Sequence, residues 1–386
     1  MKQNKDITRY KTQNGKKRYR FKVYVGKDEE TGNSIQARKQ GFKSYDDALK
    51  SYFEIKDKVA KGTYTGNENK KHKFSELYEM WLENYKNTVK VSTLSNTKLF
   101  FRLHILPELG NLYIEKITTF KCQKIVNKWF KELPKTYKVY TNLASNIFKF
   151  AVNNDLIAKN PMKSVIKPKL QVEKKPFTNF YSKNELNIFL KEAKECKGLK
   201  VYMLFRLLAY TGMRRGEALA LKWSDIDFSN QTIKINKTVT TAEHAALIIG
   251  TPKTKASYRT IAIDRQTIKY LSGWRKEQRK QLFQLGFNAL SDDQLIFSNG
   301  DNTLIRQATV RKWDQSISKH AGLKYITVHG FRHTHASLLF EAGTPMQDVK
   351  ERLGHSSITT TMNIYTHVTK SAKKKTADNF AQFMEG

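Results

Sequence analysis

The N-terminal stretch of the chain alternates apolar and polar positions in the manner of a β-strand. Residues 19–25, YRFKVYV, place an apolar or aromatic side chain at every second position, which is the period of a half-buried strand. The Asn14-Gly15 pair is a strong hairpin signal, and a turn at 31–33 precedes a third strand from Ser34 to Gly41. Ser44 then begins a helix that runs to about Ala60. The pattern predicts a small sheet with one helix.

From residue 74 the period changes to that of α-helices. Apolar side chains three or four positions apart predict a helix over residues 74–85 with one apolar face. Three more helices are expected, at Ser92 to His104, 118–133 and 135–154, with Pro107 and Gly110 ending the first of them. Polar segments at 62–73 and 167–181 are expected to be linkers. We expect the following side chains to form core and no ligand site: Phe74, Leu77, Tyr78, Trp81, Leu82 and Tyr85.

From Ser182 onward the pattern mixes helices with a strand-rich stretch between about Thr232 and Ile263. No internal repeat is present, and the only low-complexity segment is Lys373-Lys374-Lys375. The predicted fold class is therefore multidomain and mainly α. It comprises a small N-terminal β-sheet-plus-helix module, a helical domain, and a mixed α+β domain.

The charge balance points to a polyanionic partner. The chain carries 70 Lys and Arg against 35 Asp and Glu, a formal net charge of +35, and such an excess opposes compaction. Nucleic acid is the first candidate, because neutralised phosphates release counterions. A membrane surface is disfavoured because the basic residues do not gather in one amphipathic helix. The apolar run from Val201 to Tyr210 contains Arg206 and is too short to span a bilayer.

The ends and the cysteines suggest an intracellular protein. Residues 1–6 lead into no apolar stretch, so no signal peptide is expected. Cys122 and Cys196 have neither metal-ligand spacing nor a disulfide framework, and we expect two reduced core thiols.

Basic residues in the first two domains are candidates for DNA contact. Arg18, Arg20 and Lys22 lie on the expected sheet, whose strands could enter a major groove. A solvated basic face explains them equally well. Lys98 and Arg102 lie on the polar side of a predicted helix and could grip a DNA backbone, although a solvated face again accounts for them.

Two segments of the third domain offer cations for a phosphate. Thr211 to Glu217 follow a buried-looking helix that Gly212 would end, so Arg214 falls near the start of the next helix, where it can bind a phosphate through two hydrogen bonds. Thr251 to Lys255 lie between two strand-like segments, and Lys253 at a hairpin tip could reach into a groove and donate a proton. Singly, each would usually be an ordinary surface residue.

Two later segments supply histidines and a tyrosine. His329 and Arg332 in HGFRHTH share one helix face, and a neutral His beside a phosphate-binding Arg suits general-base chemistry. A metal site at this histidine cluster is disfavoured, because Arg332 would repel a cation and no carboxylate or Cys lies at ligand spacing. His355 follows in LGHSS, and then Tyr365, whose hydroxyl needs activation by nearby cations.

Taken in this order, the segments resemble the tyrosine recombinase, or phage integrase, family. Arg, Lys, His-x-x-Arg, Leu-Gly-His and Tyr follow one another from about Phe177 to the end, and no catalytic position is missing. The upstream domains are similar, more weakly, to those of integrases from prophages and conjugative transposons of Gram-positive bacteria. The implied domains are an arm-type DNA-binding domain at 1–65, a helical core-binding (SAM-like) domain at 72–168, and a tyrosine-recombinase catalytic domain at 177–386.

The resemblance also implies roles for the matching residues. Tyr365 would be the nucleophile that forms a 3′-phosphotyrosine, and Arg214 and Arg332 would clamp the phosphate oxygens. Lys253 would protonate the leaving 5′ oxygen, although its neighbour Lys255 is not excluded. His329 would be the general acid/base. His355 would donate a hydrogen bond to the phosphate, and Glu217 would orient the first arginine.

The same resemblance implies the setting of the reaction. No cofactor and no metal are expected. The expected partners are core and arm attachment sites on double-stranded DNA, three further copies of the chain in a homotetramer, an excisionase and a host DNA-bending protein. The residues after Thr369 would pack on a neighbouring protomer or on their own domain. The activity would integrate and excise a phage genome or mobile element in the bacterial cytoplasm, in association with the nucleoid.

Two other functions share part of this pattern. A type IB topoisomerase uses the same phosphotyrosine chemistry on one duplex, but the N-terminal module and the Leu-Gly-His to Tyr spacing disfavour it. An architectural DNA-binding protein derived from a recombinase would be expected to have lost a catalytic residue. The attachment sequence, the integration target, the balance of integration and excision, and the oligomeric state off DNA are not encoded in any motif.

Overall fold

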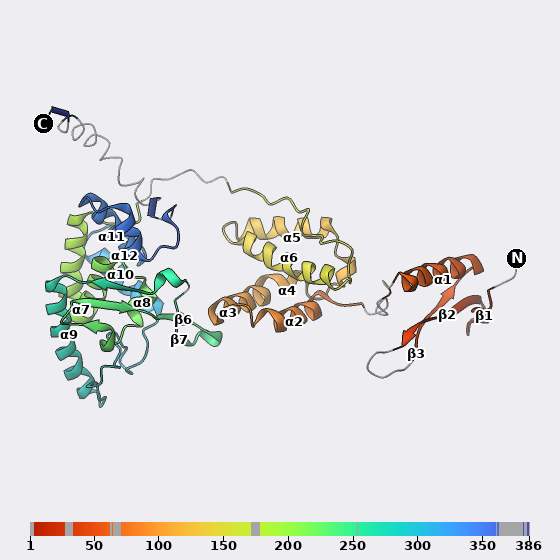
Figure 1. The fold of residues 1–386 in the computed structure, drawn as a ribbon, viewed down its shortest axis with the longest axis horizontal. Helices are drawn as coiled ribbons and strands as arrows, with labels where there is room; N and C mark the ends of the chain where they lie inside the picture. Colours follow the sequence, from red (N-terminus) through yellow and green to blue (C-terminus); the bar gives the residue numbers. More distant parts are fainter. Residues whose placement is uncertain are drawn as a thin grey trace. The chain divides into compact units, whose positions relative to one another are not determined.

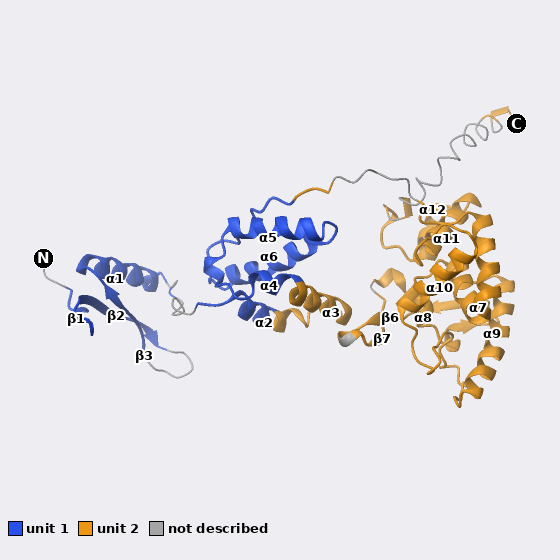
Figure 2. Ribbon diagram, turned by 180° about the vertical axis from the view of Figure 1, so that it is seen from behind, with its two compact units in different colours: residues 1–81, 104–167 blue, residues 82–103, 168–386 orange. Residues whose placement is uncertain are grey.

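The computed structural model describes residues 4–27, 34–61, 64, 71–170, 178–252, 254–359, 361–362, 381 and 384–385. Figure 1 shows the elements in chain order, and Figure 2 shows two compact units. The first unit comprises residues 1–81 and 104–167, and the second comprises residues 82–103 and 168–386. Lys253, Tyr365 and most of the segment from Thr369 onward lie outside the described residues.

The N-terminal module is a three-stranded antiparallel sheet with one helix on one face, as predicted (Figure 1). Its strands are β1 (Ile7–Lys11), β2 (Lys17–Lys27) and β3 (Ser34–Phe42), and its helix is α1 (Tyr45–Ala60). The Ser44 hydroxyl caps α1 by accepting a hydrogen bond from the backbone N–H of Asp47. Phe21 of β2 packs against Tyr52 of α1, with ring centroids 5.6 Å apart, so the alternation in β2 reflects burial against this helix.

The helical region contains a wider turn that the apolar period does not predict. Its elements are α2 (Phe74–Tyr85), α3 (Val91–Phe100), a π-helical turn (Phe101–Ile105), α4 (Leu106–Leu109), a 3-10 turn (Ile114–Lys116), α5 (Thr119–Glu132) and α6 (Tyr137–Asn153). The helix expected at Ser92 to His104 is therefore divided. Pro107 has no N–H to donate to the carbonyl four residues earlier, and the π turn buries both Phe101 and Ile105.

Four of the six side chains expected on the apolar face of α2 are core. Phe74, Leu77, Tyr78 and Leu82 are buried, whereas Trp81 and Tyr85 are only partly buried. The Phe74 ring meets Phe148 of α6 with centroids 5.4 Å apart. The polar side chains of α2 face away from this cluster, so the periodicity there records packing.

From residue 168 onward, the second unit places short strands beside a set of packed helices. Its helices are α7 (Lys183–Thr211), α8 (Arg215–Leu219), α9 (Arg265–Gln284), α10 (Gln307–His320), α11 (Gly330–Glu341) and α12 (Met346–Leu353). Its strands are β4 (Ile226–Asp227), β5 (Thr232–Ile235), β6 (Thr238–Thr241), β7 (Leu247–Gly250) and β8 (Arg259–Ala262), with 3-10 turns at Trp223–Asp225, Glu243–Ala245 and Lys255–Ser257.

Helix α7 is the centre of this unit. A kink at Gly198, which has φ 79°, divides it into two segments. The second segment is buried along almost its whole length from Val201 to Thr211, and it packs against α9, α10 and α11. Burial on all sides accounts for the apolar run seen in the sequence. No helix in the described part of the chain is long and apolar enough to cross a membrane.

Two predictions from the sequence are wrong in detail. The loop that carries Lys253 is not a hairpin tip, because β7 pairs with β6 whereas β8 pairs with β5 in a separate sheet ordered β4-β5-β8. The β5–β8 pairing buries Ile233 and Ile261 opposite each other, which β7 could not do from its own ladder. Cys196 is also exposed, whereas Cys122 is the buried thiol that was expected.

The fold class is confirmed: the protein is multidomain and helix-rich, with a small N-terminal sheet module, a helical region and a mixed third domain.

Candidate active site

Helix α7 ends at a glycine that the surrounding side chains require. Gly212 has φ +64°, and a Cβ at this position would lie 2.5 Å from Leu353 Cδ2 and 2.7 Å from His335 Cδ2. The chain then turns sharply, and Arg214 becomes the residue before α8, as the sequence predicts. The backbone path at Gly212 therefore fixes where the Arg214 side chain begins.

The Arg214 guanidinium is held by groups from three segments. Its Nη1 donates to Glu217 Oε1 at 2.8 Å and to Ser257 Oγ at 3.3 Å, and its Nη2 contacts the Gly354 carbonyl at 3.4 Å. The side chain is 38% exposed, so it is anchored at the base and open at one edge. A guanidinium held in this way can offer its remaining N–H groups to an anion.

Glu217 is a buried carboxylate between two arginines. Its side chain is 2% exposed and accepts hydrogen bonds from Arg214 and, at 3.0 Å, from Arg259 Nη2. Burial alone would raise the pKa of this carboxyl group, but the charges and hydrogen bonds of Arg259 and Arg214 outweigh burial and lower it. Glu217 is therefore ionised and orients Arg214.

Arg259 was not identified from the sequence as part of this site. It also donates from Nε to the Arg352 carbonyl at 2.9 Å and from Nη1 to the Ser257 carbonyl at 3.1 Å. The sequence could have shown this through strand alternation. Arg259 and Ile261 point to one side of the strand, Tyr258 and Thr260 point to the other, and Ile261 is buried. A charged residue at an inward strand position calls for a buried partner.

Arg332 is the most deeply buried cation of the site. It lies in the first turn of α11 and is 2% exposed. Nη1 donates to the Gly212 carbonyl at 2.8 Å and Nη2 to the Leu353 carbonyl at 2.7 Å. Burial, followed by repulsion from Arg214 and Arg259, lowers its pKa to about 9, which leaves it charged at neutral pH. Both of these partners are neutral carbonyls, so the charge of Arg332 is available to an anion.

The histidines near these arginines are neutral at pH 7. His329 immediately precedes α11, and burial together with the charges of Arg332, Arg214 and Arg215 lowers its pKa. His355 follows Gly354 after α12, and burial with the same two arginines of the site lowers its pKa to about 3. Neutral imidazoles can exchange protons with a reacting group or donate one hydrogen bond to it.

His333 and His335 make different contacts from those of His329 and His355. The His333 ring meets His329 edge to face with centroids 4.8 Å apart, and burial lowers its pKa to about 4. His335 lies inside the core, where Nδ1 contacts the Ala209 carbonyl at 2.8 Å and Nε2 accepts from Arg352 Nε at 3.0 Å. In the described part of the chain, no group of three or more His, Cys, Asp or Glu side chains could hold a metal ion.

A cavity of about 1030 Å³ opens beside these groups. Its lining includes Arg214, Glu217, Ser257, His329 and Ser356, together with Arg215 and Arg311. The structure therefore brings together four of the residues predicted from the sequence, namely Arg214, His329, Arg332 and His355. The two other predicted residues, Lys253 and Tyr365, lie outside the described residues, and the described neighbours Pro252 and Thr254 line the cavity.

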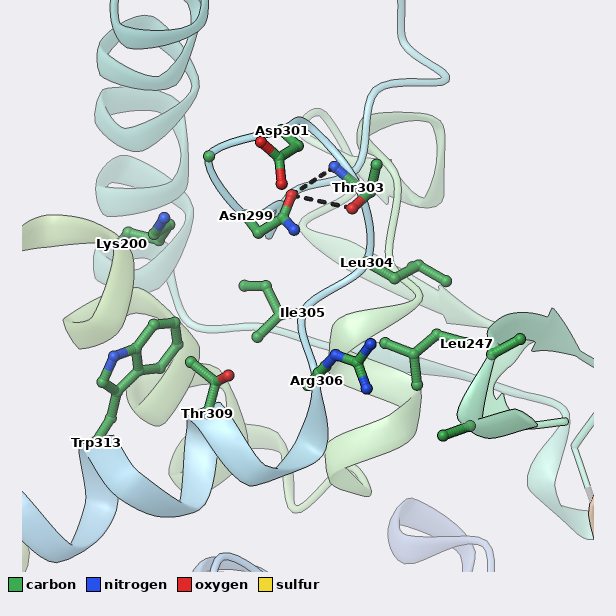
Figure 3. A pocket seen from close by; sticks show the side chains of 13 residues that line it. Lys200, Leu247, Asn299, Asp301, Thr303, Leu304, Ile305, Arg306, Thr309 and Trp313 are labelled. Carbon is green, nitrogen blue, oxygen red and sulfur yellow. Dashed lines mark hydrogen bonds between the residues drawn. The ribbon is translucent and has the colours of Figure 1, made fainter. Parts of the chain in front are cut away.

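A second cavity, of about 640 Å³, lies elsewhere in the same unit (Figure 3). It is lined by Lys200, Asp301, Arg306 and Trp313 among others. The Asn299 carboxamide oxygen accepts hydrogen bonds from the Thr303 backbone N–H and hydroxyl (Figure 3), so this oxygen is used within its own turn. None of the described residues of the sequence motifs lines this cavity.

The basic residues predicted on the N-terminal sheet do share one face. Arg18, Arg20 and Lys22 alternate with Phe21 and Val23, which are buried toward α1. Directly opposite residues share a face of a sheet, so the register adds residues of β1 and β3, and Tyr24 of β2, to this surface. We name it the outer sheet face. It consists of Thr8, Tyr10, Arg18, Arg20, Lys22, Tyr24, Gln36, Arg38 and Gln40.

The two basic residues predicted on the helical region differ from each other. Lys98 of α3 forms an ion pair with Glu243, Nζ to Oε1 2.5 Å, in which both side chains are about half exposed. Arg102, in the π turn, is exposed. Arg102 is therefore free to face solvent or a ligand, whereas Lys98 already has a carboxylate partner.

Three family models match successive parts of the chain. Residues 8–59 match an Arm DNA-binding domain, residues 73–130 a phage integrase N-terminal SAM-like domain, and residues 179–372 the phage integrase family. The chain is 32% identical over 381 residues to a XerC-like tyrosine recombinase from Caldanaerobacter subterraneus subsp. tengcongensis, covering 93% of this chain and 95% of the relative. It is 29% identical to the ICEBs1 integrase of Bacillus subtilis, covering 95% and 97%.

Solved structures share the fold. The Tn1549 transposon integrase in complex with a circular intermediate DNA gives a TM-score of 0.64 at 19% identity, covering 78% of this chain and 99% of that one. A lambda integrase tetramer bound to a Holliday junction gives 0.57 at 17% identity, covering 94% and 95%.

The chain belongs to the phage integrase family, the class of tyrosine recombinases that the motif order indicates. It is a site-specific recombinase whose partner is DNA, and it cleaves and rejoins strands in the integration and excision of a mobile element.

Proposed function

We propose that Tyr365 is the nucleophile and that the described arginines bind the phosphate it attacks. The observation that carries this proposal is the convergence of Arg214 and Arg332, one anchored by a carboxylate and the other by backbone carbonyls, beside a cavity with neutral histidines. A phosphodiester gains negative charge on its non-bridging oxygens in the transition state, and two preorganised guanidiniums stabilise that charge.

The remaining roles follow the bonds that must change. The Tyr365 oxygen forms a bond to phosphorus as the bond from phosphorus to the 5′ oxygen breaks, which leaves a 3′-phosphotyrosine and a free 5′-hydroxyl. His329 takes the phenol proton, and Lys253 gives a proton to the departing oxygen. His355 donates a hydrogen bond to a phosphate oxygen. Attack by the 5′-hydroxyl of a partner strand reverses these transfers, so one phosphodiester replaces another without a cofactor.

The lysine assignment rests on the turn between β7 and β8. Lys253 follows Pro252, which lines the cavity, whereas Lys255 is exposed in the adjacent 3-10 turn. This arrangement supports Lys253 over Lys255. Substituting each in turn, with a bridging 5′-phosphorothiolate at the crossover, identifies the proton donor, because a thiolate leaving group does not require the proton.

We assign the three domains to three DNA contacts. Residues 1–65 bind arm sites through the outer sheet face, residues 72–168 bind the core site with Arg102 on the backbone, and residues 177–386 perform catalysis. Arg18, Arg20 and Lys22 lie on a sheet face whose described residues include no acidic side chain, which suits a polyanion. Arm and core contacts by one chain bridge distant DNA segments.

The assembly that fits this reaction is a homotetramer holding two duplexes, in the bacterial cytoplasm at the nucleoid. A lambda integrase structure with a Holliday junction is a tetramer, which supports the same stoichiometry here. A bending protein and an excisionase would set the direction of recombination, because arm binding makes the outcome depend on DNA architecture.

The function is tested by trapping the covalent intermediate. The full chain is incubated in EDTA with a labelled, nicked duplex carrying the crossover site of the element that encodes it, and then run on a denaturing gel. We expect a labelled protein band, and peptide mapping places the phosphate on Tyr365. Joined products from two different duplexes distinguish a recombinase from a topoisomerase. A band that persists with Tyr365→Phe, or no band on a bound site, would overturn the assignment.

The outer sheet face gives a separate prediction about arm binding. Replacing both Arg20 and Lys22 with Gln should weaken arm-site binding and reduce the slope of log K against log salt by roughly 1.8, about 0.9 for each lost phosphate contact. Lys50→Gln with Lys56→Gln, on the exposed side of α1, is the charge-matched control. Equal salt slopes for the two double variants, measured by fluorescence anisotropy, would count against this face.

A further inference from the structure

His355 makes a side-chain contact that the roles above do not use. Its Nδ1 lies 2.9 Å from the Thr361 hydroxyl, and Thr361 is fully buried. The ring also lies within the electrostatic influence of Arg214 and Arg332. One nitrogen of the ring is therefore committed to Thr361, and only Nε2 remains for the reacting phosphate.

The proton on this ring must be on the correct nitrogen. A neutral imidazole carries one N–H, and phosphate oxygens only accept hydrogen bonds. His355 can donate from Nε2 only if its Nδ1 accepts a hydrogen bond from another group. A threonine hydroxyl can donate that bond, whereas a carbonyl cannot.

A second histidine in the same unit shows the opposite arrangement. His335 contacts the Ala209 carbonyl through Nδ1, and its Nε2 accepts from Arg352. The carbonyl fixes the proton on Nδ1 and removes Nε2 as a donor. The partner at Nδ1 thus decides what each ring can do, and the two histidines have chemically different partners.

We propose that Thr361 is a positioning residue that makes neutral His355 a hydrogen-bond donor to the scissile phosphate, by donating its own hydroxyl proton to Nδ1. This inference rests on the proposed role of His355. Thr361 does not touch the phosphate and acts through the ring. The same hydroxyl can also accept a hydrogen bond from Nδ1. Thr361 is therefore compatible with either tautomer of the neutral ring, and the tautomer with its proton on Nε2 is the one that suits a bound phosphate.

The test compares two nearly isosteric changes that differ in the hydroxyl. In single-turnover formation of the covalent complex on a nicked duplex, Thr361→Val should lower the rate between about 10-fold and about 100-fold, the range for loss of one charge-assisted hydrogen bond. Thr361→Ser keeps the hydroxyl and should stay within about 3-fold. Thr359→Val, at an exposed threonine of the same segment, is the control and should not change the rate. DNA affinity should be unchanged in all three.

The His355→Ala background separates this role from a direct effect on the segment that leads to Tyr365. Because the proposed effect passes through the ring, Thr361→Val should add less than about twofold once the ring is absent. An equal further loss in that background, or equal impairment by Ser and Val, would overturn the inference while leaving the recombinase function intact. No covalent product from the unchanged protein would instead refute the proposed function, and this inference with it.

Discussion

Arg332→Lys should lower the rate of strand cleavage by about 1,000-fold or more while leaving DNA affinity nearly unchanged, on the scale seen when a preorganised cation is removed from an acyl or phosphoryl transfer site. The Arg332 guanidinium donates hydrogen bonds from Nη1 to the Gly212 carbonyl and from Nη2 to the Leu353 carbonyl. A lysine has one ammonium on a flexible stem. It cannot satisfy both carbonyls and also present a fixed pair of donors to a phosphate.

The measurement is single-turnover formation of the covalent complex, with affinity for the uncleaved site measured in parallel. Arg275→Lys is the matched control, because this residue lies on α9 and pairs with the carboxylate of Asp292 outside the cavity. The control should cleave at the rate of the unchanged protein. Cleavage by Arg332→Lys within about tenfold of that rate would show that the guanidinium group of Arg332 is not required for strand cleavage.

Glu217→Gln should destabilise the protein by about 3 kcal/mol or more and also slow cleavage, because removing one partner of a buried ion pair leaves the other charge uncompensated. The carboxylate is 2% exposed, and Arg259, which it pairs with, is 7% exposed. Without it, Arg259 and Arg214 would face each other across a neutral amide. Arg214 would also lose its main anchor.

Urea denaturation measures the free energy of unfolding, and the cleavage assay measures the effect on Arg214. Glu83→Gln is the control, since Glu83 is 71% exposed in its pair with Lys86, and such surface pairs contribute roughly 0 to 1 kcal/mol. Loss of stability in Glu217→Gln no larger than in this control would contradict a bridging carboxylate.

The sequence anticipates the parts of the site that depend on local backbone structure. Gly212 ends α7, Arg214 begins the next turn, and His329 with Arg332 lies at the start of α11, because each follows from capping and helical spacing. Each of these motifs is weak alone, and it is their order along the chain that indicates the recombinase family. The N-terminal sheet with its basic outer face was likewise predicted, since strand alternation and turn residues are local signals.

The sequence does not anticipate contacts that depend on long-range pairing. The pairing of β8 with β5, and not with β7, is set by burial of Ile261 against Ile233, which no local pattern records. Arg259 becomes part of the site only through that pairing. Thr361 lies only six residues after His355, but a threonine in a polar run has no distinguishing period, so its contact with the ring is seen only in the structure.

The two deepest hydrogen bonds of the site end on main-chain oxygens, those of Gly212 and Leu353, and not on side chains. Substitution of a flanking residue does not remove a peptide carbonyl, so the anchorage of Arg332 is insulated from most single-codon changes nearby. What it requires is the course of the main chain, and this course depends on Gly212 and Gly354, where a Cβ would collide with neighbouring atoms. The Arg332 anchorage should therefore be most sensitive, within these two turns, to substitution of the two glycines.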